Sequence, residues 1–322
     1  MDTIKFIFSF FKLKNFIYKH FLYILQKRTK EKYIKNILVT GGAGFIGSHL
    51  CKKLSENLAY KVYSLDNYST GNKKNHHNGV SYIKGNTTDI SSLIDFKVDT
   101  IFHLGEYSRV EQSFEDIKTV WKSNKDGIFS VLEFVREKNC KLVYAGSSTK
   151  FGDGGLGRSA SPYAWTKASN TELVKNYGTW YGIDYAITYF YNVYGKREIS
   201  TGKYATLIGL FKEKMKKNEP LPIVKPGIQK RNFTHIDDII EALVLIGEKA
   251  YGDDFGIGHF KSYSIEEIAK LFGGKIKYLE ERKGNRMNSE VFTSKTEALG
   301  WSVKKSLEQY IQNLRKNNWR DL

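Results

Sequence analysis

Three polar residues in two adjacent segments have the types needed for proton transfer. Ser147 lies in "YAGSSTKFG", and Tyr163 and Lys167 lie in "SPYAWTKA". A four-residue spacing places Tyr163 and Lys167 on the same face of a helix. An ammonium group beside a phenol favours the phenolate, which would make Tyr163 a base for a substrate hydroxyl, and Ser147 could hydrogen-bond the same oxygen. The three residues predict removal of a hydroxyl proton while a hydride leaves the same carbon.

This chemistry also needs a hydride acceptor, and a glycine-rich segment is a candidate site for one. In "ILVTGGAGFIGSHL", Gly42, Gly44 and Gly47 form the pattern Gly-x-Gly-x-x-Gly between a predicted buried strand at 37–39 and a predicted helix at 45–58. Such a turn lets the backbone approach a pyrophosphate and points the helix N-terminus at it. The alternative is a tight turn that binds no ligand.

An acidic residue follows the next predicted strand. Asp66 comes directly after the strand at 62–65, about 20 residues beyond Gly47. A carboxylate at this point can accept hydrogen bonds from adenosine ribose hydroxyls and repels a 2′-phosphate. We therefore expect NAD rather than NADP. Asp66 could also simply start the turn "DNYSTGN", and the two roles can coexist.

The remaining pattern indicates the elements that position these residues. Alternating strands and helices predict a parallel sheet with helices on both faces, a Rossmann-type doubly wound α/β fold. Further strands are predicted at 80–85, 99–104, 141–147 and 184–190, and helices at 123–138 and 161–182. Beyond residue 190 the elements shorten, and "PLPIVKP" holds three of the four prolines, which predicts a smaller C-terminal α/β substrate lobe. The predicted division is an NAD-binding domain at 36–190, to which 233–257 return, and a substrate-binding lobe at 191–232 and 258–322.

The composition limits the classes of partner and site. The net charge is +17, but no basic run is interleaved with aromatic residues on a recognisable nucleic-acid module, so no nucleic-acid partner is expected. Cys51 and Cys140 lack Cys-x-x-Cys spacing, which predicts neither a disulfide framework nor a metal site. A cytoplasmic protein is the natural expectation.

Residues 1–35 predict an amphipathic helical extension with a wide aromatic face. Nine Lys or Arg residues interrupt it, and it has no small-residue cleavage site, so neither a membrane span nor a signal peptide is expected. Two interpretations stay open. The helix could pack against the protein body or a second subunit, or residues 4–25 could lie peripherally on the inner face of a membrane.

Eight motifs occur in an order that resembles a known family. They are "VTGGAGFIGSHL", "SLDNYSTGN", "HLGEYSRVEQS", "YAGSSTKFG", "SPYAWTKA", "YFYNVYGKRE", "RNFTHIDDI" and "EALGW". Over about residues 36–302 the chain resembles the extended short-chain dehydrogenase/reductases, in particular the NAD-dependent nucleotide-sugar epimerase/dehydratase group. The resemblance implies NAD, a UDP- or GDP-sugar substrate, and a role in bacterial surface polysaccharide biosynthesis. It also implies a homodimer or higher homo-oligomer that pairs through helices at 109–138 and 161–181.

The resemblance further implies roles for individual residues. Ser147, Tyr163 and Lys167 would be the catalytic set, Asp89 would meet the adenine amine, and Arg282 would hold the nucleotide end of the substrate. Asn192 and Arg231 would bind the substrate diphosphate, with Ser148 also on the substrate side. The implied cofactor-binding residues are Gly41, Gly44, Phe45, Ile46, Gly47, Asp66, Asn67, Asp89, Ile90, Leu104, Gly105, Tyr163 and Lys167.

Three departures from the family pattern bear on the reaction. Dehydratases of the family have Thr-Asp-Glu where this chain has Ser147-Ser148-Thr149, and water loss needs a general acid near C6. The family usually has Ala after "HLA", whereas this chain has Glu106 after "HLG", so we hypothesise that Glu106 selects the substrate or restores acid/base catalysis. The segment "DGGLGRSASP" before Tyr163 is short, which predicts an altered sugar pocket.

These features favour NAD-dependent oxidation at C4 of a nucleotide-activated sugar. The 4-keto intermediate would either return as the 4-epimer or leave as a 4-keto product. A nucleotide-sugar 4,6-dehydratase is the alternative, and a catalytically silent NAD-binding scaffold is the second alternative.

Overall fold

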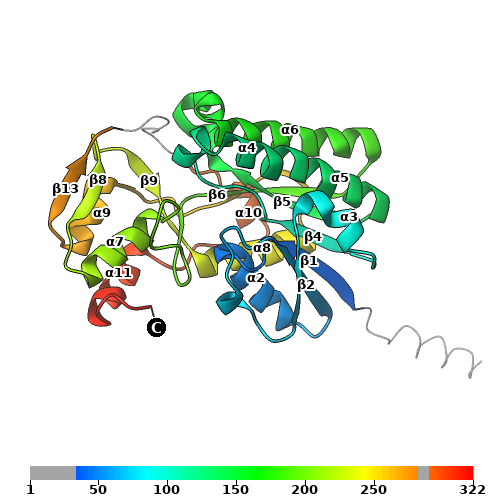
Figure 1. Cartoon of the computed structure of the whole chain (residues 1–322), viewed down its shortest axis with the longest axis horizontal. Coiled ribbons are helices and arrows are strands. Elements are labelled where there is room, and N and C mark those ends of the chain that lie inside the picture. Colours follow the sequence, from blue (N-terminus) through cyan, green and yellow to red (C-terminus); the bar gives the residue numbers. More distant parts are fainter. Residues whose placement is uncertain (1–33, 282–289, 322) are drawn as a thin grey trace, which may run out of the picture.

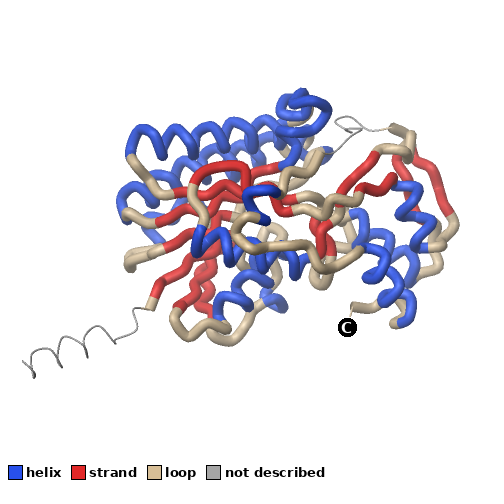
Figure 2. The backbone as a smooth tube through the Cα atoms, turned by 180° about the vertical axis from the view of Figure 1, so that it is seen from behind, coloured by secondary structure: helices blue, strands red, loops and turns tan. Residues whose placement is uncertain are grey.

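A seven-stranded parallel sheet forms the larger part of the molecule. The computed structural model describes residues 34–281 and 290–321, without the side chains of residues 150, 152–154 and 156. The strand order is β11-β6-β5-β4-β1-β2-β3, and helices cover both faces (Figures 1 and 2), which confirms the predicted Rossmann-type fold. The strands are β1 (Lys35–Thr40), β2 (Tyr60–Asp66), β3 (Val80–Lys84), β4 (Thr100–His103), β5 (Lys141–Ser147), β6 (Tyr185–Phe190) and β11 (Gly252–Ile257).

Each face of this sheet has its own hydrophobic core. Side chains alternate across a strand, so in β1 Leu38 and Val39 point to opposite cores, and both are fully buried. One core packs against α2 (Phe45–Ser55) and α8 (Ile236–Lys249). The other core packs against α3 (Ile90–Leu93), α5 (Gly127–Lys138) and α6 (Pro162–Tyr181), and α4 (Ile117–Val120) contacts α6. Burial on both faces explains why the strands read as continuous apolar runs.

The smaller C-terminal lobe is built from paired short strands. The pairs are β7 (Val193–Tyr194) with β10 (Thr234–His235), β9 (Lys230–Asn232) with β12 (Ser262–Ser264), and β8 (Leu221–Val224) with β13 (Ile276–Leu279). Three helices pack with these strands, α7 (Leu207–Lys216), α9 (Ile265–Phe272) and α11 (Leu307–Lys316), whereas α10 (Ser294–Glu297) contacts β11. Phe211 of α7 and Phe272 of α9 meet edge to face at 5.6 Å within a separate core.

The segment around α10 crosses back to the large sheet, although we expected all of 258–322 in the smaller lobe. Thr296 donates a hydrogen bond to the Gly256 carbonyl at 2.7 Å, and Trp301 donates to the Asp238 carbonyl at 2.9 Å. Trp301 is 3% exposed within the core formed with α2 and α8. The segment follows this path because it covers apolar surface of the large sheet that would otherwise face water.

The predicted amphipathic helix lies almost entirely outside the described residues. Only residues 34 and 35 of the extension are described, and Lys35 begins β1. Its packing against a subunit and the membrane contact of residues 4–25 therefore stay predictions. Within the described ranges, no helix combines the length and apolar character required to cross a bilayer.

The turn between β1 and α2 has almost no space for side chains. A Cβ atom on Gly47 would lie 2.1 Å from the Gly41 carbonyl oxygen, which is far inside contact distance. On Gly44, which has an extended backbone with φ −78°, a Cβ atom would lie 3.2 Å from the same oxygen. In both cases the contacted atom is the backbone oxygen of Gly41, which cannot move aside as a flexible side chain can. The two positions therefore differ chiefly in how closely the added Cβ atom would approach it.

We predict that Gly47→Ala destabilises the protein more than Gly44→Ala. Overpacking in a rigid site costs about 1–3 kcal/mol, and the 2.1 Å approach at Gly47 cannot be relieved by a flexible side chain. Urea denaturation of the two variants and the parent measures the difference in the free energy of unfolding. Equal losses would show that the turn relaxes around a methyl group at either position.

Candidate active site

The carboxyl ends of the parallel strands open into one large cavity that both lobes line. Its volume is about 1070 Å³, which exceeds a typical site for one drug-sized ligand and leaves room for a cofactor beside a substrate. Its place at the carboxyl ends of the strands is the expected one for an open α/β sheet. The expected site residues that line it are Gly41, Gly44, Phe45, Ile46, Gly47, Asp66, Asn67, Leu104, Gly105, Glu106, Ser147, Ser148, Tyr163, Lys167, Asn192 and Arg231.

Two of the expected site residues that the structure describes do not line this cavity. The lining extends along 85–88 and stops before Asp89, whose side chain is exposed. Ile90 is fully buried in the core beneath α5, where a ligand cannot reach it. Arg282 lies outside the described residues.

Asp66 connects the glycine-rich turn to the loop that follows β2. One carboxylate oxygen accepts a hydrogen bond from the Ala43 amide at 2.9 Å, and the other accepts from the Tyr68 amide at 2.7 Å. α2 begins at Phe45 without a side-chain cap, so its first N–H groups remain available to a phosphate. This turn and the acidic residue beside it fit a dinucleotide. These two hydrogen bonds give Asp66 a structural role in the turn. Asp66 also lies at the position expected for a ribose-binding residue.

The predicted catalytic residues come together where β5 ends and α6 begins. The Tyr163 hydroxyl donates a hydrogen bond to Ser147 Oγ at 3.1 Å, and both side chains are almost fully buried. α6 begins immediately before Tyr163 because the Ser161 side chain caps the Ala164 amide and Pro162 occupies the first turn. Local sequence thus fixes the start of the helix that presents Tyr163 to the cavity.

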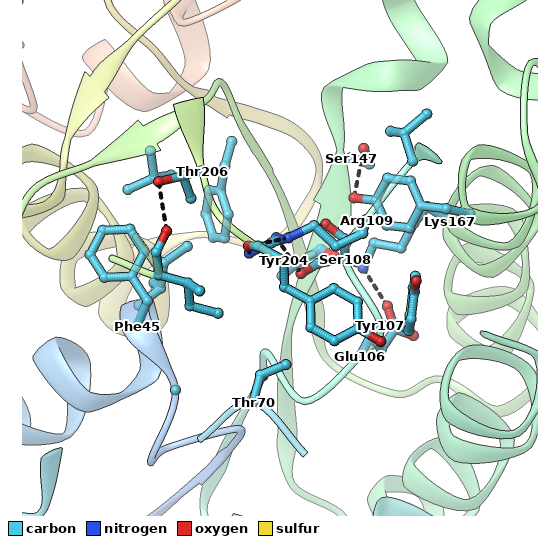
Figure 3. A pocket seen from close by; sticks show the side chains of 18 of the residues that line it. Phe45, Thr70, Glu106, Tyr107, Ser108, Arg109, Ser147, Lys167, Tyr204 and Thr206 are labelled. Carbon is cyan, nitrogen blue, oxygen red and sulfur yellow. Dashed lines mark hydrogen bonds and ion pairs between the residues drawn. The ribbon is translucent and has the colours of Figure 1, made fainter. Parts of the chain in front are cut away.

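Lys167 forms an ion pair with Glu106, which lies just beyond the end of β4 (Figure 3). The Lys167 ammonium also donates to the Ala145 carbonyl. Only 6% of the Lys167 side chain and 3% of the Glu106 side chain are exposed, so water screens the pair weakly. Glu106 accepts two further hydrogen bonds, from the Tyr144 hydroxyl at 3.0 Å and the Asn170 amide at 3.1 Å.

These neighbours keep Glu106 ionised. Burial opposes its charge, but Lys167 and His103 outweigh that effect and lower the pKa of Glu106 to about 2. A carboxylate with this pKa is a poor proton donor at neutral pH. The geometry therefore favours a positioning role for Glu106, which holds the ammonium of Lys167 one helical turn from Tyr163.

A loop after β4 contributes cavity residues that we did not single out from the sequence. The buried Asn124, in the π-helical turn Trp121–Asp126, accepts from the Tyr107 amide at 2.7 Å and donates to the Tyr107 carbonyl at 3.1 Å. Arg109 follows on the same loop and reaches the Tyr204 carbonyl from across the cavity. The sequence feature that could have identified Arg109 is its position as a charged residue shortly after the carboxyl end of the predicted strand at 99–104.

We predict that Glu106→Gln lowers the free energy of unfolding at about pH 7 by an amount on the order of 3 kcal/mol. The folded-state pKa of about 2 lies below the ordinary value of 4.5. The stabilisation is therefore complete above about pH 4.5 and is lost as the pH falls toward 2, so the difference between parent and variant should shrink in that window. Urea denaturation of the parent and the variant across this pH range measures the difference in their free energy of unfolding.

The matched control is Glu172→Gln on α6, the helix that carries Lys167. Glu172 pairs with Arg158 at 2.9 Å, but both side chains are about half exposed, so the pair contributes little. A Glu106→Gln difference no larger than that of this control at about pH 7 would contradict the proposed importance of the buried pair.

The comparisons with known proteins agree with this geometry. A "Putative UDP-glucose 4-epimerase" of Methanocaldococcus jannaschii is 34% identical over 307 residues, which cover 88% of this chain and 99% of that protein. The crystal structure of UDP-glucose 4-epimerase from Thermotoga maritima with UDP-glucose has a TM-score of 0.80 and 28% identity, covering 88% of this chain and 99% of that one.

A second solved structure contains both a substrate and a cofactor. UDP-glucuronic acid 4-epimerase from Bacillus cereus, in complex with UDP-glucuronic acid and NAD, has a TM-score of 0.78 and 27% identity, covering 87% of this chain and 100% of that one. The family model of the NAD dependent epimerase/dehydratase family matches residues 37–258. The chain with the Ser147, Tyr163 and Lys167 site is thus a member of the NAD-dependent epimerase/dehydratase family.

Proposed function

We propose that this enzyme inverts C4 of a UDP-sugar through a 4-keto intermediate. The observation that carries the proposal is the 3.1 Å hydrogen bond from Tyr163 to Ser147 inside the cavity. These residues can act on one sugar hydroxyl, and the strand end around them reads Ser147-Ser148-Thr149 rather than the acidic run of the dehydratases. The 4-epimerases among the relatives support the same reaction.

The chain's own residues account for the proton transfers. When NAD is bound at the glycine-rich turn and Asp66, it supplies a hydride acceptor that can also give the hydride back. Tyr163 accepts the proton of the 4-hydroxyl, and Ser147 hydrogen-bonds the oxygen that becomes a carbonyl. Lys167 stabilises the phenolate of Tyr163, and Glu106 holds Lys167 in place.

Epimerisation then requires the 4-keto sugar to present its other face. Both lobes line the cavity in which this rotation would take place. Tyr163 returns the proton to the same oxygen after the sugar has turned. One proton and one hydride leave and return, so the substrate undergoes no net oxidation.

The smaller lobe supplies residues for the diphosphate of the substrate. Asn192 lies just before β7 and Arg231 lies in β9, and both line the cavity. The Asn192 amide donates to the Asn232 carbonyl at 2.8 Å, which ties the loop after β6 to β9. Arg231 offers a planar guanidinium, which suits phosphate oxygens.

Pairing of two copies is a further part of the proposal. Trp121 and Trp165 stack at 5.9 Å with their planes 12° apart, on the surface formed by the α4–α5 segment and α6. They are 47% and 42% exposed. Such apolar exposure on two long helical segments supports a homodimer that buries them.

We predict that the NAD-loaded enzyme converts a UDP-sugar into an isomer of unchanged mass. Incubation in heavy water followed by chromatography and mass spectrometry should show a new peak without carbon-bound deuterium, since the hydride returns from the cofactor. Loss of two hydrogens would instead indicate net dehydrogenation. Loss of water with gain of deuterium would indicate 4,6-dehydration.

Tyr163→Phe should reduce the turnover rate by about 10²–10⁴-fold, because the proton acceptor is removed. The control is Tyr181→Phe at the exposed end of the same helix, which should leave the rate unchanged. Equal measurable rates for the parent and Tyr163→Phe would show that Tyr163 is not the proton acceptor, and absence of turnover by the parent would support the silent scaffold.

A further inference from the structure

The sugar-binding side of the cavity contains a cationic group that the proposed mechanism does not use. Arg109 lies on the loop after β4 and lines the cavity with Ser147 and Tyr163. In Figure 3 its guanidinium extends across the cavity between Ser147 and Tyr204. We propose that Arg109 binds a carboxylate carried by the sugar, so that the substrate is an acidic nucleotide sugar. This inference rests on the proposed function and specifies its substrate class.

The position of Arg109 is determined by contacts on both sides of the cavity. Its Nε and Nη2 atoms donate to the Tyr204 carbonyl at 2.9 and 2.7 Å, and Nη1 donates to the Ser108 carbonyl at 3.0 Å and the Ser108 hydroxyl at 3.2 Å. The loop itself is anchored through Tyr107 by the buried Asn124. A guanidinium held in this way is preorganised for a ligand.

These contacts leave part of the binding capacity of Arg109 available. A guanidinium has five N–H donors, and the four hydrogen bonds engage at most four of them. The three acceptor atoms are the Tyr204 carbonyl, the Ser108 carbonyl and the Ser108 hydroxyl, and none of these uncharged oxygens neutralises the positive charge. The remaining capacity suits an anion, because a hydrogen bond between charged groups is about twice as strong as a neutral one.

Two carboxylates near Arg109 are committed to other cations. Asp116 accepts from Lys203 at 3.0 Å and from the Tyr107 and Tyr204 hydroxyls. Glu106 is paired with Lys167. Among the described residues, no carboxylate forms an ion pair with Arg109, and the groups that act on its charge are Tyr163, Tyr107 and Tyr204.

The surroundings make an unpaired cation costly. Burial lowers the pKa of Arg109, although a guanidinium remains protonated at neutral pH. A partly buried charge without a counterion carries a desolvation penalty that a ligand anion would offset. The cavity is therefore electrostatically suited to a negative group near Tyr163.

The position of Arg109 also indicates which negative group this is. The glycine-rich turn and α2 serve the cofactor phosphates, and Asn192 with Arg231 serves the substrate diphosphate in the proposed function. Arg109 instead shares its part of the cavity with Tyr163, the residue assigned to the 4-hydroxyl. A carboxylate near C4 would be either that of a uronic acid at C5 or that of a carboxyalkyl ether at C3.

The test measures binding to the NAD-loaded enzyme by calorimetry. The probes are UDP-glucuronic acid against UDP-glucose, for a carboxylate at C5, and UDP-N-acetylmuramic acid against UDP-N-acetylglucosamine, for one at C3. We expect the parent to bind the acidic member of one pair at least about tenfold more tightly than the neutral member. Arg109→Gln should abolish that preference and change binding of the neutral sugar by less than about threefold, whereas Arg109→Lys should keep most of the preference because it keeps the charge.

Two controls separate recognition from a structural role. Arg136→Gln, at an exposed arginine paired with Glu133, should leave both affinities unchanged. Equal weakening of acidic and neutral sugars by Arg109→Gln would show that Arg109 only ties the loop to Tyr204, and would overturn the proposal. So would a parent enzyme that prefers the neutral sugar of both pairs. An Arg109-dependent preference for an acidic sugar that is bound but not epimerised would leave this inference standing and refute the proposed function.

Discussion

The buried ion pair between Lys167 and Glu106 connects the elements on which the active site depends. Lys167 belongs to α6, Glu106 follows β4, and the Ala145 carbonyl that also contacts the ammonium belongs to β5. A buried charge is tolerated only when its partner and its remaining hydrogen bonds are in place. The pair therefore constrains α6 against the sheet and, with it, the position of Tyr163.

The same pair limits what the site can do chemically. Glu106 is held as a carboxylate by Lys167 and is a poor acid at neutral pH, so the cavity lacks the proton donor that dehydration would use at that position. The remaining groups, Ser147 and Tyr163, can move a proton to and from one oxygen. Reversible oxidation at a single carbon is the chemistry that this set supports best.

Positive charge is distributed unevenly along the cavity. The ammonium of Lys167 is neutralised by its partner, whereas the guanidinium of Arg109 meets only uncharged oxygens. The Lys167–Glu106 pair adjusts the proton affinity of Tyr163, whereas Arg109 creates a positive potential that attracts an anion. Two cations in one cavity thus have different consequences because their immediate neighbours differ.

Much of the architecture could be predicted from local patterns. The glycine-rich turn after an apolar run, Asp66 at the next strand end, and the four-residue spacing of Tyr163 and Lys167 follow from strand and helix periodicity, and the sheet has the predicted parallel form. Periodicity succeeded because a buried parallel strand and an amphipathic helix each impose a short repeat on the chain. No sequence repeat predicts that Trp301 lies against the large sheet. Its position depends on a hydrogen bond to the Asp238 carbonyl in α8, which is distant in the chain.

The contacts of Glu106 and Arg109 could not be predicted from the amino-acid order, because both join residues that are far apart in the chain. Glu106 and Lys167 are 61 positions apart, and Arg109 and Tyr204 are 95 apart. No local propensity encodes such pairs, because they form only when separate strand ends are brought to one edge of the sheet. The chain's own residues specified the turn, the helix that carries Tyr163 and the type of cofactor. The folded arrangement assigned Glu106 to Lys167 and left Arg109 facing the cavity, because burial and charge pairing depend on neighbours that are distant in the chain.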